Sequence, residues 1–507
     1  MDRSIRRLGM FLMLCFCALF VQLNYIQVFR ASDLNTKPGN DRSIVAAFAR
    51  PRGTIVTADG VLLARSVPSD DRFQYQRQYP EGEAYAALTG FFNYSRGATG
   101  LERAYNDELS GKTAKQQVRS VGDLFVKTDR TGNLKLSVRS DIQRVAKQAL
   151  GNQKGSVVAL DPRTGEILAL YSNPSYDPNL LASHDFTKSE GAYKLLDAAK
   201  DSPLLPKAYR QIYPPGSTFK VVTGSTGVEK GGVTPAEPVY PTIRALDVPG
   251  TTKDLANFAH ELCGGTLFHI LAKSCNTSFA QMGLDLGADK MVAGAQSFGF
   301  NQVPPFDLPA VASVFPTDFT RNQPALAQAS IGQNSTAGSP LQMALVAAGV
   351  ANDGVVMEPH VVSEIRDGEG DVVESHHPTQ WKRAVSPQTA DIMRQAMLEA
   401  VTNGTATRLQ IPGLDVGAKT GTAQFGPSVP LRSHAWVICW AGKPGEPASI
   451  AVAVIVEDQS GAAESTGGRV AAPIAKQVIE QSLKPMPAPP ADTTTTSVTP
   501  STTRSGH

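Results

Sequence analysis

The sequence has little excess charge, few cysteines and none of the common zinc-binding patterns. Its 507 residues contain 48 Lys and Arg against 46 Asp and Glu, a formal charge of +2, and only five cysteines. Nucleic acid would require a basic face, for which this balance gives no argument. The nearest candidates for metal ligands are His260, Cys263, His269 and Cys275. Their spacing matches neither Cys-x-x-Cys nor His-Glu-x-x-His. We therefore expect no nucleic-acid partner, no metal and no cofactor.

An uncharged segment, Leu8 to Phe29, stands near the N-terminus behind three arginines. Its length matches the roughly 20 residues of a bilayer-spanning helix. The preceding arginines predict an N-terminus inside the cell and the rest of the chain outside. A cleaved signal peptide is the alternative, but no persuasive Ala-x-Ala site follows. We expect residues 1–30 to be an uncleaved, single-pass anchor in the cytoplasmic membrane.

The cysteines divide between the anchor and the exported part. Cys15 and Cys17 lie in the anchor, and Cys263, Cys275 and Cys439 lie beyond it. Oxidising surroundings permit disulfides, and Cys263 with Cys275 is the nearest pair. Small buried thiols are the alternative. The sequence leaves this choice open.

The length of the chain implies at least two folded units. In the first, the Asp59-Gly60 pair between apolar runs predicts a hairpin within residues 50–64. Residues 97–111 have the pattern of one short amphipathic helix. A second unit is expected to start near Leu134, with a strand over 134–138 and then a helix to Leu150 capped by Ser140 or Asp141.

The rest of the second unit mixes strands and helices. A hairpin is predicted over 155–171, and further strands over 435–440 and 450–456. Helical patterns dominate between 217 and 350 and from 386 to 402. A sheet of chain-distant strands with helices between them implies an α+β fold. Residues 485–507 are rich in Pro and Thr, and we expect them to be disordered.

The segment Tyr213-Pro-Pro-Gly-Ser217-Thr-Phe-Lys220 combines a turn with the start of a helix. Positions three apart share a helix face, which would bring the Lys220 amine to the Ser217 hydroxyl. Serine needs a base to become a strong nucleophile. Lysine can be that base when burial or another cation lowers its pKa. Taken alone, Ser-x-x-Lys fits an ordinary helix start equally well.

The segment Ser274-Cys275-Asn276 separates two apolar helical stretches. A hydroxyl and a carboxamide two residues apart on a turn can face one cavity. Ser274 would then relay a proton, and Asn276 would hold a substrate backbone. Ser-x-Asn tripeptides are frequent in loops, so the segment has meaning only beside the other motifs.

The segment Gly417-Ala-Lys419-Thr420-Gly421-Thr422 predicts a strand, since Gly421 would weaken a helix. Glycine also allows a peptide substrate to approach the strand backbone closely. Lys419 offers a cation and Thr420 a hydroxyl for a substrate carboxylate. A solvated loop is the alternative for this segment alone.

These three motifs stand in the order found in penicillin-binding proteins and serine β-lactamases. The chain resembles class B penicillin-binding proteins, in the division-associated branch of Gram-positive-type cell walls. The resemblance extends over roughly residues 1 to 483. It includes Arg52-Gly-Thr-Ile, Gly100-Leu-Glu102, residues 155–169 and 173–179, Ile331-Gly-Gln333, residues 339–343 and His434-Ala-Trp436.

The resemblance implies an α+β transpeptidase domain of the penicillin-binding, serine β-lactamase-like fold. Such a domain has an antiparallel sheet flanked by helices and a helical subdomain. We expect it at residues 134–484, after the anchor at 1–30 and an elongated, dimerisation-like pedestal at 31–133. The tail at 485–507 would follow it.

The resemblance also implies the activity, a D,D-transpeptidase that cross-links peptidoglycan stem peptides and that β-lactams inhibit. Ser217 would attack the carbonyl of the penultimate D-alanine, and Lys220 would accept its proton. Ser274 with Lys419 would pass a proton to the departing D-alanine. The amine of a second stem peptide would then attack the acyl-enzyme.

The same resemblance assigns the binding groups. Asn276 would orient the donor peptide. Backbone amides of Ser217 and Thr422 would form the oxyanion hole. Lys419, Thr420 and Thr422 would hold the terminal carboxylate of the substrate, with Gly421 between them on the strand.

Other activities of the same fold remain to be weighed. A class A β-lactamase needs a glutamate-held water, and no Glu occurs between Asn276 and Glu358. A D,D-carboxypeptidase shares all the catalytic residues and is not separated by sequence. A non-catalytic division scaffold or β-lactam sensor is disfavoured because no motif residue is lost.

The region between the anchor and the transpeptidase domain is short. About 100 residues are too few for a second enzyme domain with its linker. The family implies instead a separate membrane glycan polymerase of the shape-elongation-division-sporulation type. That polymerase and division proteins are the expected protein partners, in contact with the pedestal.

Overall fold

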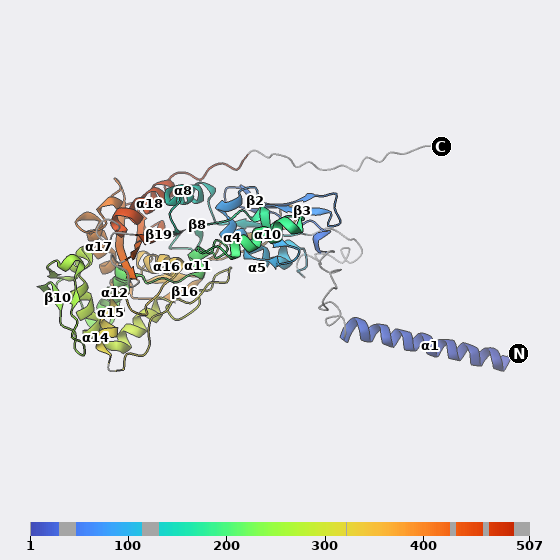
Figure 1. Ribbon diagram of the computed structural model, residues 1–507, viewed down its shortest axis with the longest axis horizontal. Coiled ribbons are helices and arrows are strands. Elements are labelled where there is room, and N and C mark those ends of the chain that lie inside the picture. Colours follow the sequence, from blue (N-terminus) through green and yellow to red (C-terminus); the bar gives the residue numbers. More distant parts are fainter. Residues whose placement is uncertain are drawn as a thin grey trace. The chain divides into compact units, whose positions relative to one another are not determined.

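The computed structural model of the chain describes residues 2–29, 47–113, 131–320, 322–425, 432–459 and 466–490. It contains two compact units, residues 1–51 with 67–76 and residues 52–66 with 77–507. Figure 1 traces the chain from helix α1 in blue to helix α18 in red. Of the tail expected to be disordered, residues 491–507 lie outside the described residues.

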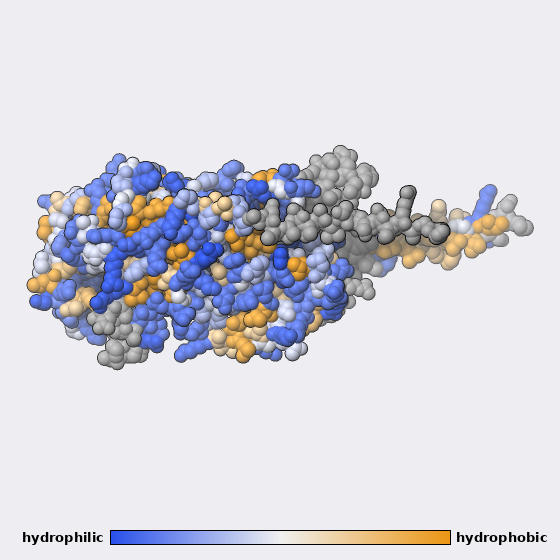
Figure 2. Space-filling model, turned by 90° about the horizontal axis from the view of Figure 1, so that it is seen from above, coloured by the Kyte–Doolittle hydropathy of each residue, from blue (hydrophilic) through white to orange (hydrophobic). Residues whose placement is uncertain are grey.

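The smaller unit contains helix α1, Asp2–Phe29. Within it, Ile5–Tyr25 is a stretch of 21 residues that is long and apolar enough to cross a membrane. Its large apolar side chains are exposed, and they form the orange surface along the helix in Figure 2. Length and composition fit a single-pass anchor, although a signal sequence has the same properties.

The larger unit contains an antiparallel sheet of five strands in the order β17-β18-β19-β7-β8. These are β17 (Asp415–Phe425), β18 (Arg432–Gly442), β19 (Ile450–Gln459), β7 (Gly155–Leu160) and β8 (Ile167–Asn173). Helices α8 (Ser140–Leu150) and α18 (Gly467–Ser482) cover one face, and α16 (Pro340–Ala351) covers the other. Both faces are buried, and the inner strands β18, β19 and β7 accordingly contain long apolar runs. The predicted α+β class and the predicted strands are confirmed.

A group of helices forms another part of the larger unit. It comprises α12 (Lys220–Gly231), α13 (Leu267–Lys273), α14 (Asn276–Ser297), α15 (Gln323–Ser330) and α17 (Pro387–Thr402). Helix α14 packs against α12 and α15, and α13 packs against α17. Short strands β9 (Tyr240–Ile243) and β12 (Cys263–Gly265) pair beside them. The helical regions predicted from the sequence are confirmed.

A second sheet joins strands from distant parts of the chain. Five neighbouring strands of this six-stranded sheet are, in order, β15 (Val372–Ser375), β14 (Val362–Arg366), β6 (Asn133–Leu136), β1 (Ile55–Val56) and β2 (Leu62–Pro68). The turn between β1 and β2 is the predicted Asp59-Gly60 turn, in which Gly60 has a φ of +81°. Strand β6 pairs parallel with β1 and antiparallel with β14. The strand predicted near Leu134 therefore exists, but it lies in this sheet and not in the five-stranded one.

The start of helix α8 differs from the prediction. Arg139 is its N-cap residue, and Ser140 is already helical. The Ser140 backbone N–H and hydroxyl donate to the carboxylate of Asp59, at 2.9 and 2.5 Å. The cap predicted at Ser140 or Asp141 is thus wrong, because a carboxylate from the β1–β2 turn takes that role.

The single helix predicted over 97–111 is two short helices. Helices α5 (Gly100–Ala104) and α6 (Asn106–Leu109) are separated at Tyr105, which has φ −113° and ψ 34°. Glu102 on α5 is fully buried and accepts from Arg52 Nε at 2.9 Å and Arg77 Nε at 2.6 Å. This buried ion cluster fixes α5 against the segments that carry the two arginines.

Candidate active site

Ser217 lies at the junction of a turn and a helix. The segment Gly216–Phe219 forms a single 3-10 turn that runs directly into helix α12. Ser217 is therefore where the sequence predicts it, at the start of a helix. Its side chain is half-buried and lines a cleft. Its hydroxyl makes no hydrogen bond to any residue in the part of the chain that the structure describes.

Lys220 is fully buried below the cleft. Its Nζ donates to the Ser274 carbonyl at 2.7 Å, to the Asn276 Oδ1 at 2.7 Å and to the Ser274 Oγ at 3.2 Å. The sequence predicted that the Lys220 amine lies near Ser217. The hydrogen-bond acceptors of this amine are instead residues of the second motif. Burial, and after it the nearby cation Lys419, hold the pKa of Lys220 well below its ordinary value. A neutral amine, able to accept a proton, is thereby favoured.

Ser274 stands between two lysine amines. It ends helix α13 in the left-handed region, with φ 62° and ψ 42°. Its Oγ accepts from Lys419 Nζ at 2.9 Å as well as from Lys220. Lys419 is also fully buried, and burial lowers its pKa to about 7. The hydroxyl thus connects two amines whose pKa values are both lowered by burial.

The third motif lies on a strand, as predicted, and that strand, β17, is at the edge of the five-stranded sheet. Thr420, Gly421 and Thr422 line the cleft, and the Thr420 hydroxyl is 2.7 Å from that of Thr405. A Cβ on Gly421 would lie 2.9 Å from the Pro215 carbonyl oxygen. The glycine therefore allows the turn before Ser217 to pack against β17. The sequence predicted that glycine lets a substrate approach the strand closely. The structure shows a second reason, the close contact of Gly421 with the turn before Ser217.

The cleft has a volume of about 1150 Å³. Ser217, Ser274 and Asn276 lie in its lining together with the Thr420–Thr422 stretch of β17. The wall from Asp254 to Glu261 also lines it, and no motif in the sequence indicated this wall. Other lining residues that sequence reasoning missed are Lys273, Gln328, Thr405, Thr466 and Gly468.

The open question about Cys263 and Cys275 is answered by a disulfide between them. The bond joins strand β12 to the middle residue of the second motif. Cys439, in contrast, is a buried free thiol. Within the described ranges, no group of three His, Cys, Asp or Glu side chains is arranged to hold a metal ion.

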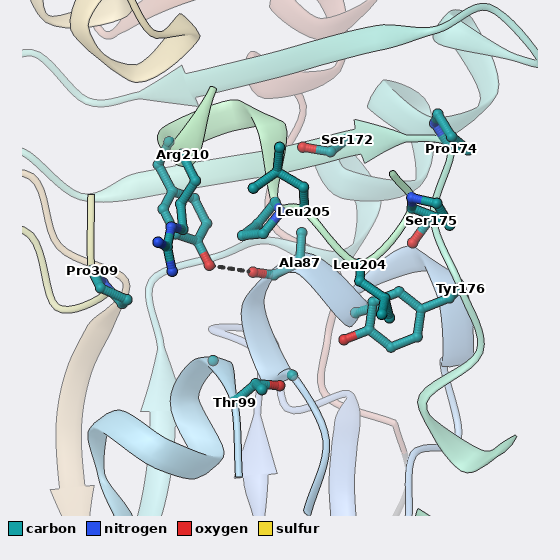
Figure 3. Close-up of a pocket in the computed structure, with 16 residues that line it drawn as sticks. Ala87, Thr99, Ser172, Pro174, Ser175, Tyr176, Leu204, Leu205, Arg210 and Pro309 are labelled. Carbon is teal, nitrogen blue, oxygen red and sulfur yellow. Dashed lines mark hydrogen bonds between the residues drawn. The ribbon is translucent and has the colours of Figure 1, made fainter. Parts of the chain in front are cut away.

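A smaller cavity of about 120 Å³, drawn in Figure 3, lies elsewhere in the larger unit. Ala87, Ser172, Tyr176 and Arg210 are among its lining residues, and the Tyr209 hydroxyl donates to the Ala87 carbonyl at 2.9 Å. None of the predicted site residues lines this cavity. The larger cleft is therefore the candidate active site.

Comparison with known proteins agrees with this geometry. Residues 155–480 match the penicillin binding protein transpeptidase domain, and residues 52–134 match the penicillin binding protein A dimerisation domain. The chain belongs to the penicillin-binding protein family. The predicted resemblance is confirmed.

Several members of this family are similar over nearly their whole length. The peptidoglycan D,D-transpeptidase PbpA of Mycolicibacterium smegmatis is 39% identical, over 96% of this chain and 99% of that protein. The PbpA of Mycobacterium tuberculosis is 38% identical, over 96% and 100%. The M. tuberculosis penicillin-binding protein A, solved as a ceftriaxone acyl-enzyme, has a TM-score of 0.81 at 37% identity, covering 87% of this chain and 100% of that one. A penicillin G acyl-enzyme of the same protein has a TM-score of 0.79 at 38% identity, covering 86% and 100%.

Proposed function

We propose that this penicillin-binding protein is a serine D,D-transpeptidase that cross-links peptidoglycan stem peptides and is inhibited by β-lactams. The observation that carries the proposal is the convergence of the three motifs on one cleft. Ser217 lines it, and Ser274 Oγ lies within hydrogen-bond distance of both Lys220 and Lys419. Relatives named as D,D-transpeptidases and solved as β-lactam acyl-enzymes support the same chemistry.

In the acylation step, Ser217 Oγ attacks the carbonyl of the penultimate D-alanine and its proton passes to the neutral Lys220 amine. The C–N bond to the terminal D-alanine then breaks. Its departing amine receives a proton through Ser274, which is next to both lysines. General acid–base transfer of this kind typically contributes about 10²–10⁴-fold to a rate.

The remaining site residues bind the substrate. The backbone N–H groups of Ser217 and Thr422 stabilise the oxyanion, and one such donor is typically worth about 3–4 kcal/mol. Thr420 and Thr422 hold the terminal carboxylate with Lys419, whose charged form the bound carboxylate favours. Asn276 orients the donor peptide, and Gly421 keeps β17 close to the nucleophile turn.

The acyl-enzyme is resolved by the amine of a second stem peptide, which releases Ser217 and forms the cross-link. In this proposal residues 1–30 anchor the chain in the cytoplasmic membrane with the N-terminus inside. Residues 31–133 form the pedestal, and residues 134–484 form the catalytic domain outside. The pedestal contacts a membrane glycan polymerase of the shape-elongation-division-sporulation type and division proteins.

The test uses the full-length chain in detergent with a fluorescent penicillin, and the Ser217→Ala variant as the control. We expect a covalent label that depends on Ser217 and persists for hours. A label lost within seconds would indicate a β-lactamase instead. No label on the folded protein would contradict the assignment of the nucleophile.

Mass spectrometry with a stem peptide ending in D-Ala-D-Ala separates the two wall-directed activities. With an amine acceptor present, a transpeptidase gives the cross-linked product. Release of D-alanine without any cross-link would identify a D,D-carboxypeptidase.

A further inference from the structure

Helix α14 begins at Asn276 and lacks a local cap. Its N-cap residue is Cys275, whose side chain makes no capping hydrogen bond because its sulfur is bonded to Cys263. The first N–H groups of a helix have no partner within the helix and need an acceptor from elsewhere. At this helix, that acceptor is Asn257, which lies 20 residues earlier in the chain.

Asn257 uses both ends of its carboxamide. Its Oδ1 accepts from the Thr277 backbone N–H at 3.1 Å and from the Thr277 hydroxyl at 3.3 Å. Its Nδ2 donates to the carbonyls of Ile243, at 2.8 Å, and Glu261, at 3.2 Å. The residue is only 6% exposed. It therefore joins the cleft wall, strand β9 and the first turn of α14.

Asn276 is the residue that this arrangement fixes. Its Nδ2 donates to the carbonyl of Ala256 at 3.0 Å, and its Oδ1 accepts from Lys220 Nζ at 2.7 Å. Its neighbours Cys275 and Thr277 are joined to Cys263 and Asn257. Asn276 and Thr277 are thus attached to the wall segment, and Cys275 is attached to strand β12, which follows that segment.

We propose that Asn257 is a positioning residue for acylation of Ser217: by capping α14 it holds Asn276, and through it the Lys220 amine, in the catalytic arrangement. This inference rests on the proposed function of Ser217 and Lys220. Asn257 acts through Thr277 and Asn276 and does not itself contact Lys220. Around that amine stand Lys419 on β17, Ser274, Asn276 and the Phe279 ring on α14.

The experiment is single-turnover acylation of the full-length protein by a fluorescent penicillin, with the concentration of penicillin varied. It separates the labelled amplitude, which counts folded protein, from the acylation rate constant at saturation. A merely structural role would lower the amplitude and the melting temperature. A positioning role lowers the rate constant at full amplitude.

We expect Asn257→Ala to lower the saturating rate constant by about 10–100-fold, the size typical of a misplaced catalytic group. Asn257→Ser retains a polar group, but its side chain is too short to reach Thr277. It should show the same loss in rate constant, and it serves as the test if Asn257→Ala does not fold. Asn257→Asp retains the oxygen that caps α14 but loses the donations to the Ile243 and Glu261 carbonyls, so its rate constant should fall less than those of the truncated variants.

Asn179→Ala is the matched control. Asn179 also bonds a backbone N–H and a carbonyl, both of Tyr79 at 2.9 Å, and does not line the cleft. It should lose thermal stability with an unchanged rate constant. A rate constant within about twofold of the parent in the truncated Asn257 variants, or a loss in Asn257→Asp as large as theirs, would overturn the proposal. A parent that is not labelled at Ser217 at all would instead refute the proposed function.

Discussion

The larger unit buries two groups of ionisable side chains. One group contains both signs of charge, and the other contains two lysines without a carboxylate partner in the part of the chain that the structure describes. Glu102 lies between two arginines, Arg52 and Arg77, so the cluster contains both signs. Burial by itself raises the pKa of Glu102, but the arginines outweigh it and leave the pKa below its ordinary value. Lys220 and Lys419 are just as deeply buried, yet no carboxylate among the described residues pairs with either.

The difference shows what each group is suited to do. A buried carboxylate with partners remains charged and orders the chain around it. Buried lysines without carboxylates lose their charge readily, which makes the amine a base. Lysines with strongly lowered pKa values beside a cleft are typical of catalytic sites. Three variants can test this comparison.

The largest effect is expected for Lys220→Met, which removes the proposed base. The saturating acylation rate constant should fall by about 10²–10⁴-fold. The melting temperature should change little, because methionine has a similar volume and the loss of three hydrogen bonds is offset by removing a buried polar amine. Labelling kinetics and thermal unfolding measure the two effects. A marked loss of stability would show that the hydrogen bonds of Lys220 outweigh the cost of burying its amine.

Glu102→Gln should lower the stability and leave the acylation rate constant unchanged. Removing one partner of a buried ion cluster typically costs about 3–5 kcal/mol, because the remaining charges are left buried. The acylation rate constant per folded molecule should be unchanged. Denaturant unfolding gives the free energy of unfolding.

Glu190→Gln is the control. Glu190 pairs with Arg96 at 2.7 Å, but both side chains are more than one-third exposed, so no measurable change in stability is expected for this variant. Equal losses in the two variants would contradict the comparison.

A smaller effect is expected in the pH dependence of stability. The folded pKa of Lys419 is about 7, while an unfolded lysine has a pKa near 10.4. Between these values the unfolded chain binds the proton and the folded chain does not, so stability rises with pH. Below the folded pKa both states are protonated, and this contribution is flat.

Lys419→Met should remove that slope. Relative to the variant, the parent should gain up to about 1.4 kcal/mol per pH unit across this window. Unfolding measured from about pH 6 to pH 10 tests it. Because Lys419 also lowers the pKa of Lys220, its removal raises that pKa, which changes the difference between the two proteins in the same direction. Parallel stability curves for the two proteins would refute the lowered pKa of Lys419.

Much of the local structure could be predicted because it depends on neighbouring residues. The Asp59-Gly60 turn, the helix start at Ser217 and the strand around Lys419 all followed from composition and alternation. The order of the three motifs, together with the wider resemblance, indicated the family. The break at Tyr105 was missed because the helical pattern continues through it.

Helix capping shows where such reasoning ends. At α8 the sequence offers Ser140 and Asp141 as caps, but Asp59 from another loop provides the acceptor. At α14 the capping position is a disulfide-bonded cysteine, and Asn257 replaces it. Each acceptor is supplied by a segment that only folding brings near. A local pattern cannot contain that information.

The sequence alone determined the chemical groups of the site and the elements that carry them, because turns, alternation and helical spacing depend on adjacent residues. Only the tertiary structure decided which of these groups meet. Ser274 joins Lys220 and Lys419, which lie 54 and 145 positions away from it, and Asn257 reaches Thr277 across 20. Tertiary packing also removes water from both lysines, and their lowered pKa values follow from that burial. A pKa shift is a property of an environment, and an environment exists only once distant segments have packed together.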